Sequence, residues 1–170
     1  KHLQNIKFDL IIYSTPPKTT TKVVQFIKKR DGAKTYLLLK DIFPQNAVDL
    51  GMIKKGGVMH RYFRRKEKKL YKVSDYIGCM SQANVEYVIH HNPEINPDVI
   101  ETNPNSIEPV RKTIQPEEKM QARRKYGIPV ATTVFIYGGN LGKPQGIDFL
   151  ISVLMANDGK QDRFFIVVGS

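Results

Sequence analysis

Five short runs of apolar residues recur along the chain of 170 residues, and helix-like segments separate them. A run that is apolar at every position, rather than at every second one, is typical of a strand buried on both faces. Parallel sheets with helices on both sides meet that condition, and alternating strands and helices imply right-handed βαβ units. The sequence therefore predicts an α/β fold with doubly wound, mainly parallel sheets. The runs are residues 10–13, 36–39, 76–80, 133–137 and 164–168.

Capping residues mark where the helices between these runs begin and end. Threonines at 19–21 predict the start of a helix that runs to about residue 30, and Gly32 supplies its stop. Ser81 is a good cap for the next helix, and Pro116 suits the first turn of a further one. A last helix is predicted over residues 146–155, directly after a glycine-rich turn.

Prolines and asparagines cluster in residues 91–115 and interrupt this alternation. We interpret the stretch as a linker with one short strand at 99–101, and we place a domain boundary near residues 107–113. Residues 1–110 then form part of a first domain with its linker, and residues 111–170 form the start of a second. Because the first residue is not Met and the last follows a strand-like run, we expect a fragment in which both domains are incomplete.

Basic residues outnumber acidic ones by 27 to 16, which gives a formal net charge of +11. Such an excess indicates an anionic partner: nucleic acid, a phospholipid surface or phosphorylated substrates. No apolar run approaches the roughly 20 residues of a membrane-spanning helix. No secretory signal pattern opens the chain, so we expect a cytoplasmic protein.

Cysteine and histidine give little sign of metal or thiol chemistry. The single cysteine, Cys79, can form no internal disulfide, and its place in an apolar run predicts a buried core residue. None of the four histidines has metal-ligand spacing with another histidine, a cysteine or a carboxylate, so no metal is expected.

The glycine-rich turn at residues 136–146 reads Ile-Tyr-Gly-Gly-Asn-Leu-Gly-Lys-Pro-Gln-Gly, between a predicted strand and a predicted helix. Glycines let the backbone approach a ligand closely, and the start of the following helix offers free N–H groups. The turn is therefore a candidate phosphate cradle, with Lys143 as a countercharge. It has neither the Walker nor the dinucleotide spacing, and a tight turn without a ligand remains the alternative.

Polar residues follow two of the predicted strands, at the carboxyl ends where open α/β sheets bind ligands. Lys40 and Asp41 follow the second strand, where Asp41 could orient a hydroxyl or cap the helix that starts near Pro44. Ser14 and Pro16 follow the first strand and could line the same crevice, or form a proline-stiffened turn.

Basic residues crowd the stretch 54–72, which we interpret as an amphipathic helix. Such a helix suits an anionic membrane surface, at roughly 1 kcal/mol per basic residue near the lipid. An ordinary solvated helix face is the alternative. The candidate membrane contacts are Arg61, Arg64, Arg65 and Lys68.

Five blocks in order along nearly the whole chain resemble the family-four retaining glycosyltransferases. The similarity is strongest to the subgroup that adds amino or deoxy sugars during assembly of bacterial surface polysaccharides. The blocks are residues 9–17, 40–48, 73–81, 103–105 and 137–146.

This resemblance implies a GT-B architecture, in which an acceptor-side and a donor-binding Rossmann-like domain face each other across a cleft. It assigns Gly139, Asn140 and Lys143 to the diphosphate of a nucleotide sugar, which the family usually binds without a metal. It also assigns Lys40 and Asp41 to the catalytic pair that faces the cleft. Many members carry His-Asp at that pair, so Lys40 departs from the family pattern.

The implied function is transfer of a hexosyl-type sugar, with retained configuration, from a UDP-linked donor to a glycan or lipid-linked acceptor. The setting would be capsule or O-antigen synthesis, with the protein peripheral to the inner face of the cytoplasmic membrane. The family's N-terminal glycine-rich loop and its donor-site acidic motif fall outside these 170 residues, so the chain alone is not expected to catalyse.

Two other functions fit parts of the sequence. A non-catalytic Rossmann-like module could bind a phosphorylated small molecule through the same glycine turn. A nucleic-acid-binding domain would suit the positive charge, but the basic residues concentrate in one predicted helix and no nucleic-acid motif is present. We therefore expect no nucleic-acid partner and no cofactor beyond the nucleotide sugar itself.

Overall fold

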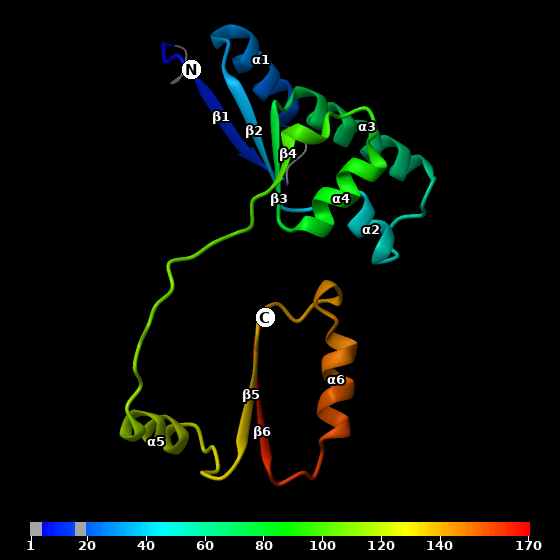
Figure 1. The fold of residues 1–170 in the computed structure, drawn as a ribbon. Helices are drawn as coiled ribbons and strands as arrows, with labels where there is room; N and C mark the ends of the chain where they lie inside the picture. The colour runs from blue at the N-terminus through cyan, green and yellow to red at the C-terminus, as the bar shows by residue number, and fades with distance from the viewer. Residues whose placement is uncertain (1–4, 16–19) are drawn as a thin grey trace. The chain divides into compact units, whose positions relative to one another are not determined.

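A computed structural model describes residues 5–15 and 20–170, which form two compact units (Figure 1). Unit 1 is Lys1–Ile107 and unit 2 is Glu108–Ser170. The division falls within the stretch that is rich in proline and asparagine.

A parallel sheet of four strands forms the centre of unit 1, in the order β1-β2-β3-β4. Each strand therefore pairs with the next one along the chain, and all four carboxyl ends lie at one edge. The parallel pairing confirms the α/β prediction. The strands are β1 (Leu10–Ser14), β2 (Lys34–Leu39), β3 (Tyr76–Cys79) and β4 (Ile100–Thr102).

The helices of unit 1 pack on one face of this sheet (Figure 1). Leu37, Ile77 and Cys79 of the sheet are fully buried against residues of α3 and α4, such as Leu70 and Val88. Ser81 accepts a hydrogen bond from the Asn84 N–H at 3.3 Å and so caps α4 as predicted. The helices are α1 (Thr21–Asp31), α2 (Gln45–Asp49), α3 (Val58–Val73) and α4 (Gln82–His91), with a 3-10 turn, η2 (Pro97–Val99), before β4.

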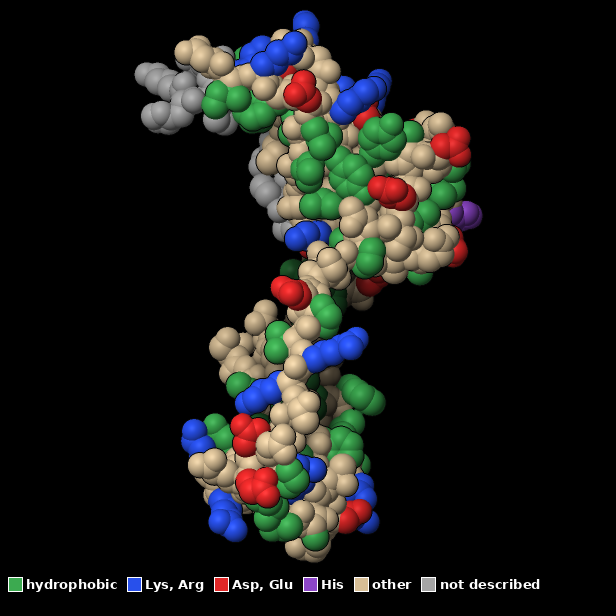
Figure 2. All heavy atoms as spheres, turned by 60° about the vertical axis from the view of Figure 1, so that its left-hand side comes forward, with side chains coloured by type: hydrophobic (Ala, Val, Ile, Leu, Met, Phe, Trp, Pro, Cys, Tyr) green, Lys and Arg blue, Asp and Glu red, His purple; other side chains and the backbone are tan. Residues whose placement is uncertain are grey.

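The other face of the sheet is open among the described residues of unit 1. Leu10, Ile12 and Tyr76 point to that face and stay largely exposed. A second layer of helices, which the continuous apolar runs led us to expect, does not cover this face within the described chain. Apolar side chains accordingly reach the surface of the molecule (Figure 2).

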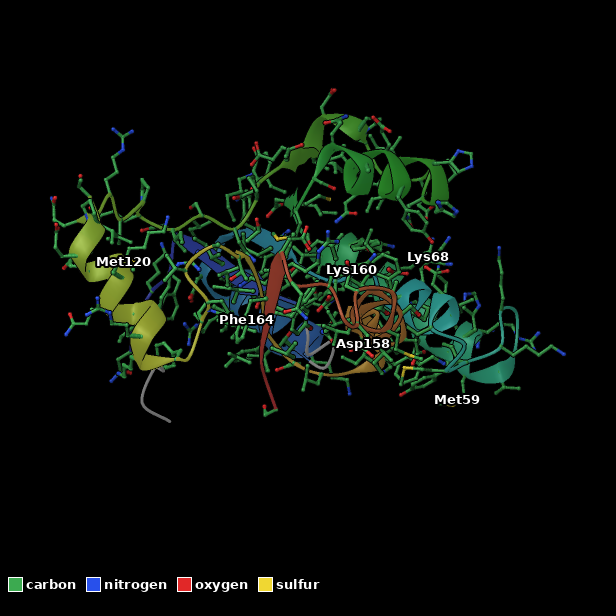
Figure 3. The ribbon with its side chains drawn as sticks, turned by 90° about the horizontal axis from the view of Figure 1, so that it is seen from below. Met59, Lys68, Met120, Asp158, Lys160 and Phe164 are labelled. Atoms are coloured by element: carbon green, nitrogen blue, oxygen red, sulfur yellow. The ribbon has the colours of Figure 1, made fainter. Side chains whose placement is uncertain are left out.

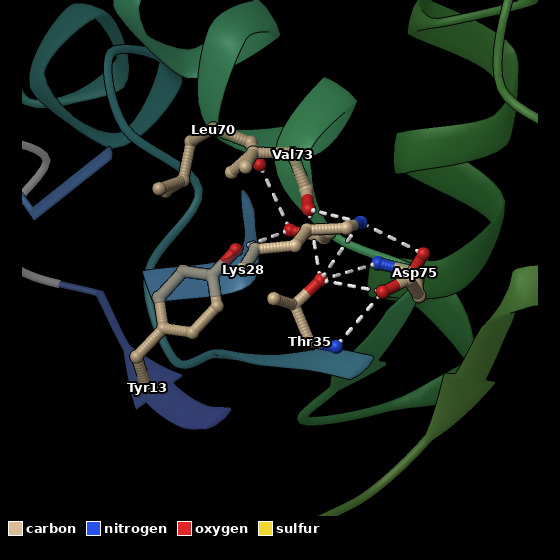
Figure 4. Close-up of polar contacts among 7 residues, drawn as sticks. Tyr13, Lys28, Thr35, Leu70, Val73 and Asp75 are labelled. Carbon is tan, nitrogen blue, oxygen red and sulfur yellow. Dashed lines mark hydrogen bonds and ion pairs between the residues drawn. The ribbon is translucent and has the colours of Figure 1, made fainter. Parts of the chain in front are cut away.

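A polar network ties α1, β2 and the turn before β3 together at the amino edge of the sheet (Figure 4). The Lys28 ammonium lies 2.8 Å from the Asp75 carboxylate and also donates to the Val73 carbonyl at 3.1 Å. The Thr35 N–H donates to the same carboxylate at 2.8 Å. Burial opposes ionisation of Asp75, but the hydrogen bonds from Lys28 and Thr35 outweigh it and hold its pKa below the ordinary value.

The lowered pKa of Asp75 predicts a pH-dependent contribution to stability. A carboxyl group whose pKa is depressed in the folded state stabilises the fold above its unfolded pKa of about 3.9. That contribution is lost as the pH falls through the native pKa. Asp75→Asn is expected to cost about 1 kcal/mol at pH 7, since the group is partly exposed. The cost should shrink at pH 3.

Urea unfolding of the unsubstituted chain and of the Asp75→Asn variant, at pH 7 and at pH 3, measures this difference in stability. Asp98→Asn is a suitable control, because Asp98 is exposed and forms no ion pair in residues 5–15 and 20–170. An equal loss of stability at pH 7 and pH 3 would contradict the assignment.

Unit 2 is built around one βαβ unit, with β5 and β6 paired in parallel. Its helix α6 starts at Ile147 rather than at Gly146, because a 3-10 turn comes first and Gly146 takes a left-handed φ of 68°. Phe149, Met155 and Ile136 are largely exposed in this unit. The elements are α5 (Pro116–Lys125), β5 (Thr133–Gly138), η3 (Lys143–Gln145), α6 (Ile147–Ala156) and β6 (Arg163–Val168).

No helix among the described residues combines the length and the apolar character needed to cross a membrane.

Candidate functional site

The carboxyl edge of the unit 1 sheet gathers polar residues from successive strand ends. Thr15 follows β1, Lys40 and Asp41 follow β2, Ser81 comes shortly after β3, and Asn103 follows β4. Because the strands are parallel, these residues share one edge, where α/β sheets bind ligands. The predicted pair Lys40 and Asp41 lies next to the end of β1.

Thr15 fixes the backbone of Asp41 through a reciprocal pair of hydrogen bonds. The Asp41 N–H donates to Thr15 Oγ1 at 3.3 Å, and Thr15 Oγ1 donates to the Asp41 carbonyl at 3.4 Å. The Thr15 N–H donates to the Leu38 carbonyl at 3.1 Å, and its side chain is buried. Thr15 is therefore a positioning residue that the sequence analysis passed over.

The side chains of Lys40 and Asp41 are exposed and take part in no ion pair or hydrogen bond within the described chain. Helix α2 has Pro44 as its N-cap and no side-chain cap, so Asp41 does not cap it. The carboxylate and the ammonium at this edge are thus available to a ligand.

Ser14 and Pro16 were also predicted to lie at this edge, and only Ser14 is among the described residues. Ser14 is the last residue of β1 and is partly buried, next to Thr15. Pro16 lies outside the described residues, so its place at the edge stays a prediction.

The glycine turn of unit 2 is held against the end of β6. The Gly139 N–H donates to the Val168 carbonyl at 3.0 Å, and the Leu141 N–H donates to the Ser170 carbonyl at 3.2 Å. The Tyr137 hydroxyl closes the turn by donating to the Asn140 carbonyl at 2.7 Å. These bonds fix the backbone in one conformation.

Gly169 permits this close approach, and sequence reasoning also missed it. A Cβ atom at residue 169 would lie 2.1 Å from the Gly139 carbonyl oxygen and 2.9 Å from the Leu141 Cγ. A side chain at this position would therefore push the turn away from β6.

Three backbone donors in the turn remain for a ligand. The N–H groups of Asn140, Gly142 and Lys143 donate to no acceptor among the described residues, and all three positions are at least partly exposed. Lys143 begins η3, is exposed, and forms no ion pair in the described part of the chain. These N–H groups and the Lys143 ammonium together suit an anion such as a phosphate. Asp148, in the first turn of α6, partly offsets the positive field.

The four candidate membrane contacts on α3 divide into two kinds. Arg64 donates to the carboxylate of Glu67, to the His91 carbonyl at 2.6 Å and to Asn92 Oδ1 at 2.7 Å. Lys68 pairs with Glu94 at 2.8 Å on the exposed surface (Figure 3). Arg61 and Arg65 are exposed and have no ion pair within the described ranges. Arg64 therefore joins α3 to α4, which favours a structural role for it.

Neither a metal cluster nor a reactive thiol is found in residues 5–15 and 20–170. No group of three or more His, Cys, Asp and Glu side chains there could hold a metal ion. Cys79 is buried, and burial raises the pKa of its thiol to about 11, so it stays protonated near neutral pH. It packs as a small apolar residue in the sheet core.

The fold and these sites together define a parallel α/β protein with polar groups at strand carboxyl ends, which is consistent with part of a GT-B fold. The chain is 24% identical over 165 residues to a protein of Pseudomonas aeruginosa described as "Probable glycosyltransferase WbjE". The alignment covers 94% of this chain and 39% of that protein, so the chain spans about two fifths of its length. No protein-family model matches the chain.

Proposed function

We propose that this chain is part of a glycosyltransferase that moves a sugar from a nucleotide-diphosphate donor to a glycan or lipid-linked acceptor. The observation that carries the proposal is the similarity to a probable glycosyltransferase along 94% of the chain. The two parallel α/β units agree with that similarity.

In this proposal the glycine turn binds the donor diphosphate. The free N–H groups of Asn140 and Gly142 would donate to phosphate oxygens, while Lys143 supplies the countercharge. Gly139 takes a φ of 155°, which favours glycine, and its N–H holds the turn against β6. The donor would be UDP-linked, and a hexosyl-type sugar would be transferred with retained configuration.

Asp41 and Lys40 would serve the acceptor side. The Asp41 carboxylate can accept a hydrogen bond from an acceptor hydroxyl, because no group of the described chain occupies it. Lys40 adds a cation beside it, and Thr15 holds the backbone that carries both. Ser14 and Pro16 would line the acceptor cleft.

The proposed setting is the assembly of surface polysaccharide, such as capsule or O-antigen, at the inner face of the cytoplasmic membrane. Arg61 and Arg65 support a peripheral membrane contact, because both are exposed and without an ion pair in the described residues. Lys68 can join them, since its pairing with Glu94 is exposed to solvent.

Calorimetric titration of UDP and GDP into the full-length parent protein tests the donor site. We expect one nucleotide to bind, and we expect Lys143→Ala to weaken it by about tenfold, since one charge-assisted contact is lost. Lys160→Ala is a matched control, because Lys160 lies in the turn between α6 and β6, at the end of the small sheet opposite to the glycine turn (Figure 1). Failure of a folded parent protein to bind either nucleotide would refute the proposal.

A further inference from the structure

A groove of about 830 Å³ lies between α1 and α3, two helices that lie side by side in unit 1 (Figure 1). Both helices turn basic side chains toward it. We name it the lysine groove after the six lysines that line it, which are Lys22, Lys28, Lys29, Lys66, Lys69 and Lys72.

The positive charge of the lysine groove is almost uncompensated. No carboxylate lines it, and within the described chain only Lys28 among its lysines forms an ion pair, with Asp75. The acidic residue of α1, Asp31, is held by Arg30. The acidic residue of α3, Glu67, is buried and bound by Arg64. The other five lysines therefore share one groove without a counterion from the described residues.

This arrangement favours a multivalent anion. Ammonium groups that share one groove repel each other within the screening length of about 10 Å at 0.1 M salt. A bound anion would turn this repulsion into attraction. Lysine ammonium groups carry three donors each and are common ligands of phosphate. Lys22 and Lys29 share a face of α1, and Lys66 and Lys69 share a face of α3, so cations line the groove from both sides.

An aromatic wall completes one side of the lysine groove. Tyr62 lines it with half of its surface exposed, and the Lys66 ammonium lies 5.5 Å from the centre of its ring. Phe63 also lines the groove and packs edge-on against Phe43, with ring centroids 4.8 Å apart. The wall is thus held in place next to the cations and offers an apolar surface to a ligand.

We propose that the lysine groove binds a phosphate-bearing ligand, with its anion among Lys29, Lys66 and Lys69 and its apolar part against Tyr62. The groove lies wholly within unit 1 and shares no residue with the glycine turn of unit 2. It also uses neither Arg61 nor Arg65, so it is separate from the candidate membrane contacts.

Titration with inorganic pyrophosphate at low ionic strength tests the proposal on the full chain. The Lys143→Ala chain serves as background, so that the glycine turn contributes less to the signal. We expect Lys66→Gln/Lys69→Gln to weaken binding by at least about tenfold, because two charge-assisted contacts are lost. Arg61→Gln/Arg65→Gln removes the same charge from the same helix outside the groove and is expected to bind as the background does.

A second variant changes α1, so the result does not depend on whether α3 folds normally after its substitutions. Lys22→Gln/Lys29→Gln alters the α1 side and should weaken pyrophosphate binding in the same direction, with folding checked by circular dichroism. Equal weakening by the groove variants and the arginine control would mean diffuse surface charge and would overturn the proposal. The proposal would also be overturned if the chain bound neither pyrophosphate nor phosphatidylcholine vesicles that contain phosphatidylglycerol.

Sedimentation with phosphatidylcholine vesicles that contain phosphatidylglycerol identifies the source of the phosphate. Lys119→Gln/Lys125→Gln is the control for the vesicles, because it removes two exposed cations of α5 that belong neither to the groove nor to the proposed membrane contacts. Vesicle binding that falls in the groove variants, but not in this control, would assign the groove to a lipid headgroup. Pyrophosphate binding that depends on the groove, without vesicle binding, would assign it to a soluble ligand.

Discussion

Arg64→Ala is expected to lower the free energy of unfolding of unit 1 by about 3 kcal/mol. The change removes a cation that pairs with Glu67, whose side chain is almost completely buried. A carboxylate left in the interior without its cation must either stay charged at high cost or take up a proton. The Tyr71 hydroxyl still donates to Glu67 at 2.9 Å, but it supplies no charge.

The loss extends beyond the ion pair. Arg64 also donates to the His91 carbonyl and to Asn92 Oδ1, and both acceptors lie at the end of α4. Asn92 is itself buried and donates to the Val88 carbonyl at 2.7 Å. Removing the guanidinium therefore leaves the buried Asn92 Oδ1 without this donor, which adds to the cost, whereas water can replace the bond to the exposed His91 carbonyl.

Urea unfolding followed by circular dichroism measures the effect, with Arg65→Ala as the matched control. Arg65 is the next residue on α3, is exposed and has no ion pair in the described chain, so its loss should cost less than about 0.5 kcal/mol. If the two variants were equally stable, the Arg64 contacts would not contribute as described.

Gly78→Ala is expected to destabilise unit 1 by about 2 kcal/mol through overpacking. A Cβ atom at residue 78 would lie 2.5 Å from the Tyr36 hydroxyl and 2.8 Å from Asn103 Cβ. The Tyr36 side chain crosses Gly78 to donate to Glu101 Oε1 at 2.6 Å, and it accepts from Asn103 Nδ2 at 2.8 Å. The ring cannot withdraw without breaking both hydrogen bonds.

A double-mutant cycle separates this clash from other effects of the substitution. In a Tyr36→Ala background the closest obstacle is gone, so Gly78→Ala should cost less there, by about 1 kcal/mol or more. Chemical unfolding of the four chains gives the coupling energy. A coupling near zero would show that the Tyr36 ring is not the obstacle.

Most of the helices and strands could be predicted from the periodic features of the sequence. The apolar runs gave the strands, and Ser81 and Gly32 marked helix ends because capping depends on residues close together in the chain. The exposure of the second face of the unit 1 sheet could not be predicted in this way. An apolar run indicates that a strand can be buried on both faces. It does not indicate whether the described chain supplies helices for both faces.

The contacts that position the candidate sites join residues far apart in the chain. No pattern of neighbouring residues in the sequence therefore predicts them. Thr15 bonds to Asp41 between the ends of two neighbouring strands, and Gly169 matters only because the glycine turn passes close to it. On α3 the expected amphipathic helix did not indicate which side chains are buried: Met59 is exposed, whereas Glu67 is buried. Arg64 was predicted as a membrane contact from its place in the basic stretch, and its ion pair with the buried Glu67 was not foreseen. The roles of Lys40, Asp41, Gly139, Asn140 and Lys143 stay predictions.

The order of strands in unit 1 has a consequence for synthesis on the ribosome. Each strand pairs with the one that precedes it in the chain, so no strand has to wait for a partner that is made much later. Every βα segment can dock on the growing sheet as it leaves the exit tunnel, with one crossover connection to close at each step. The four described strands of unit 1 can therefore pair in the order in which they are translated.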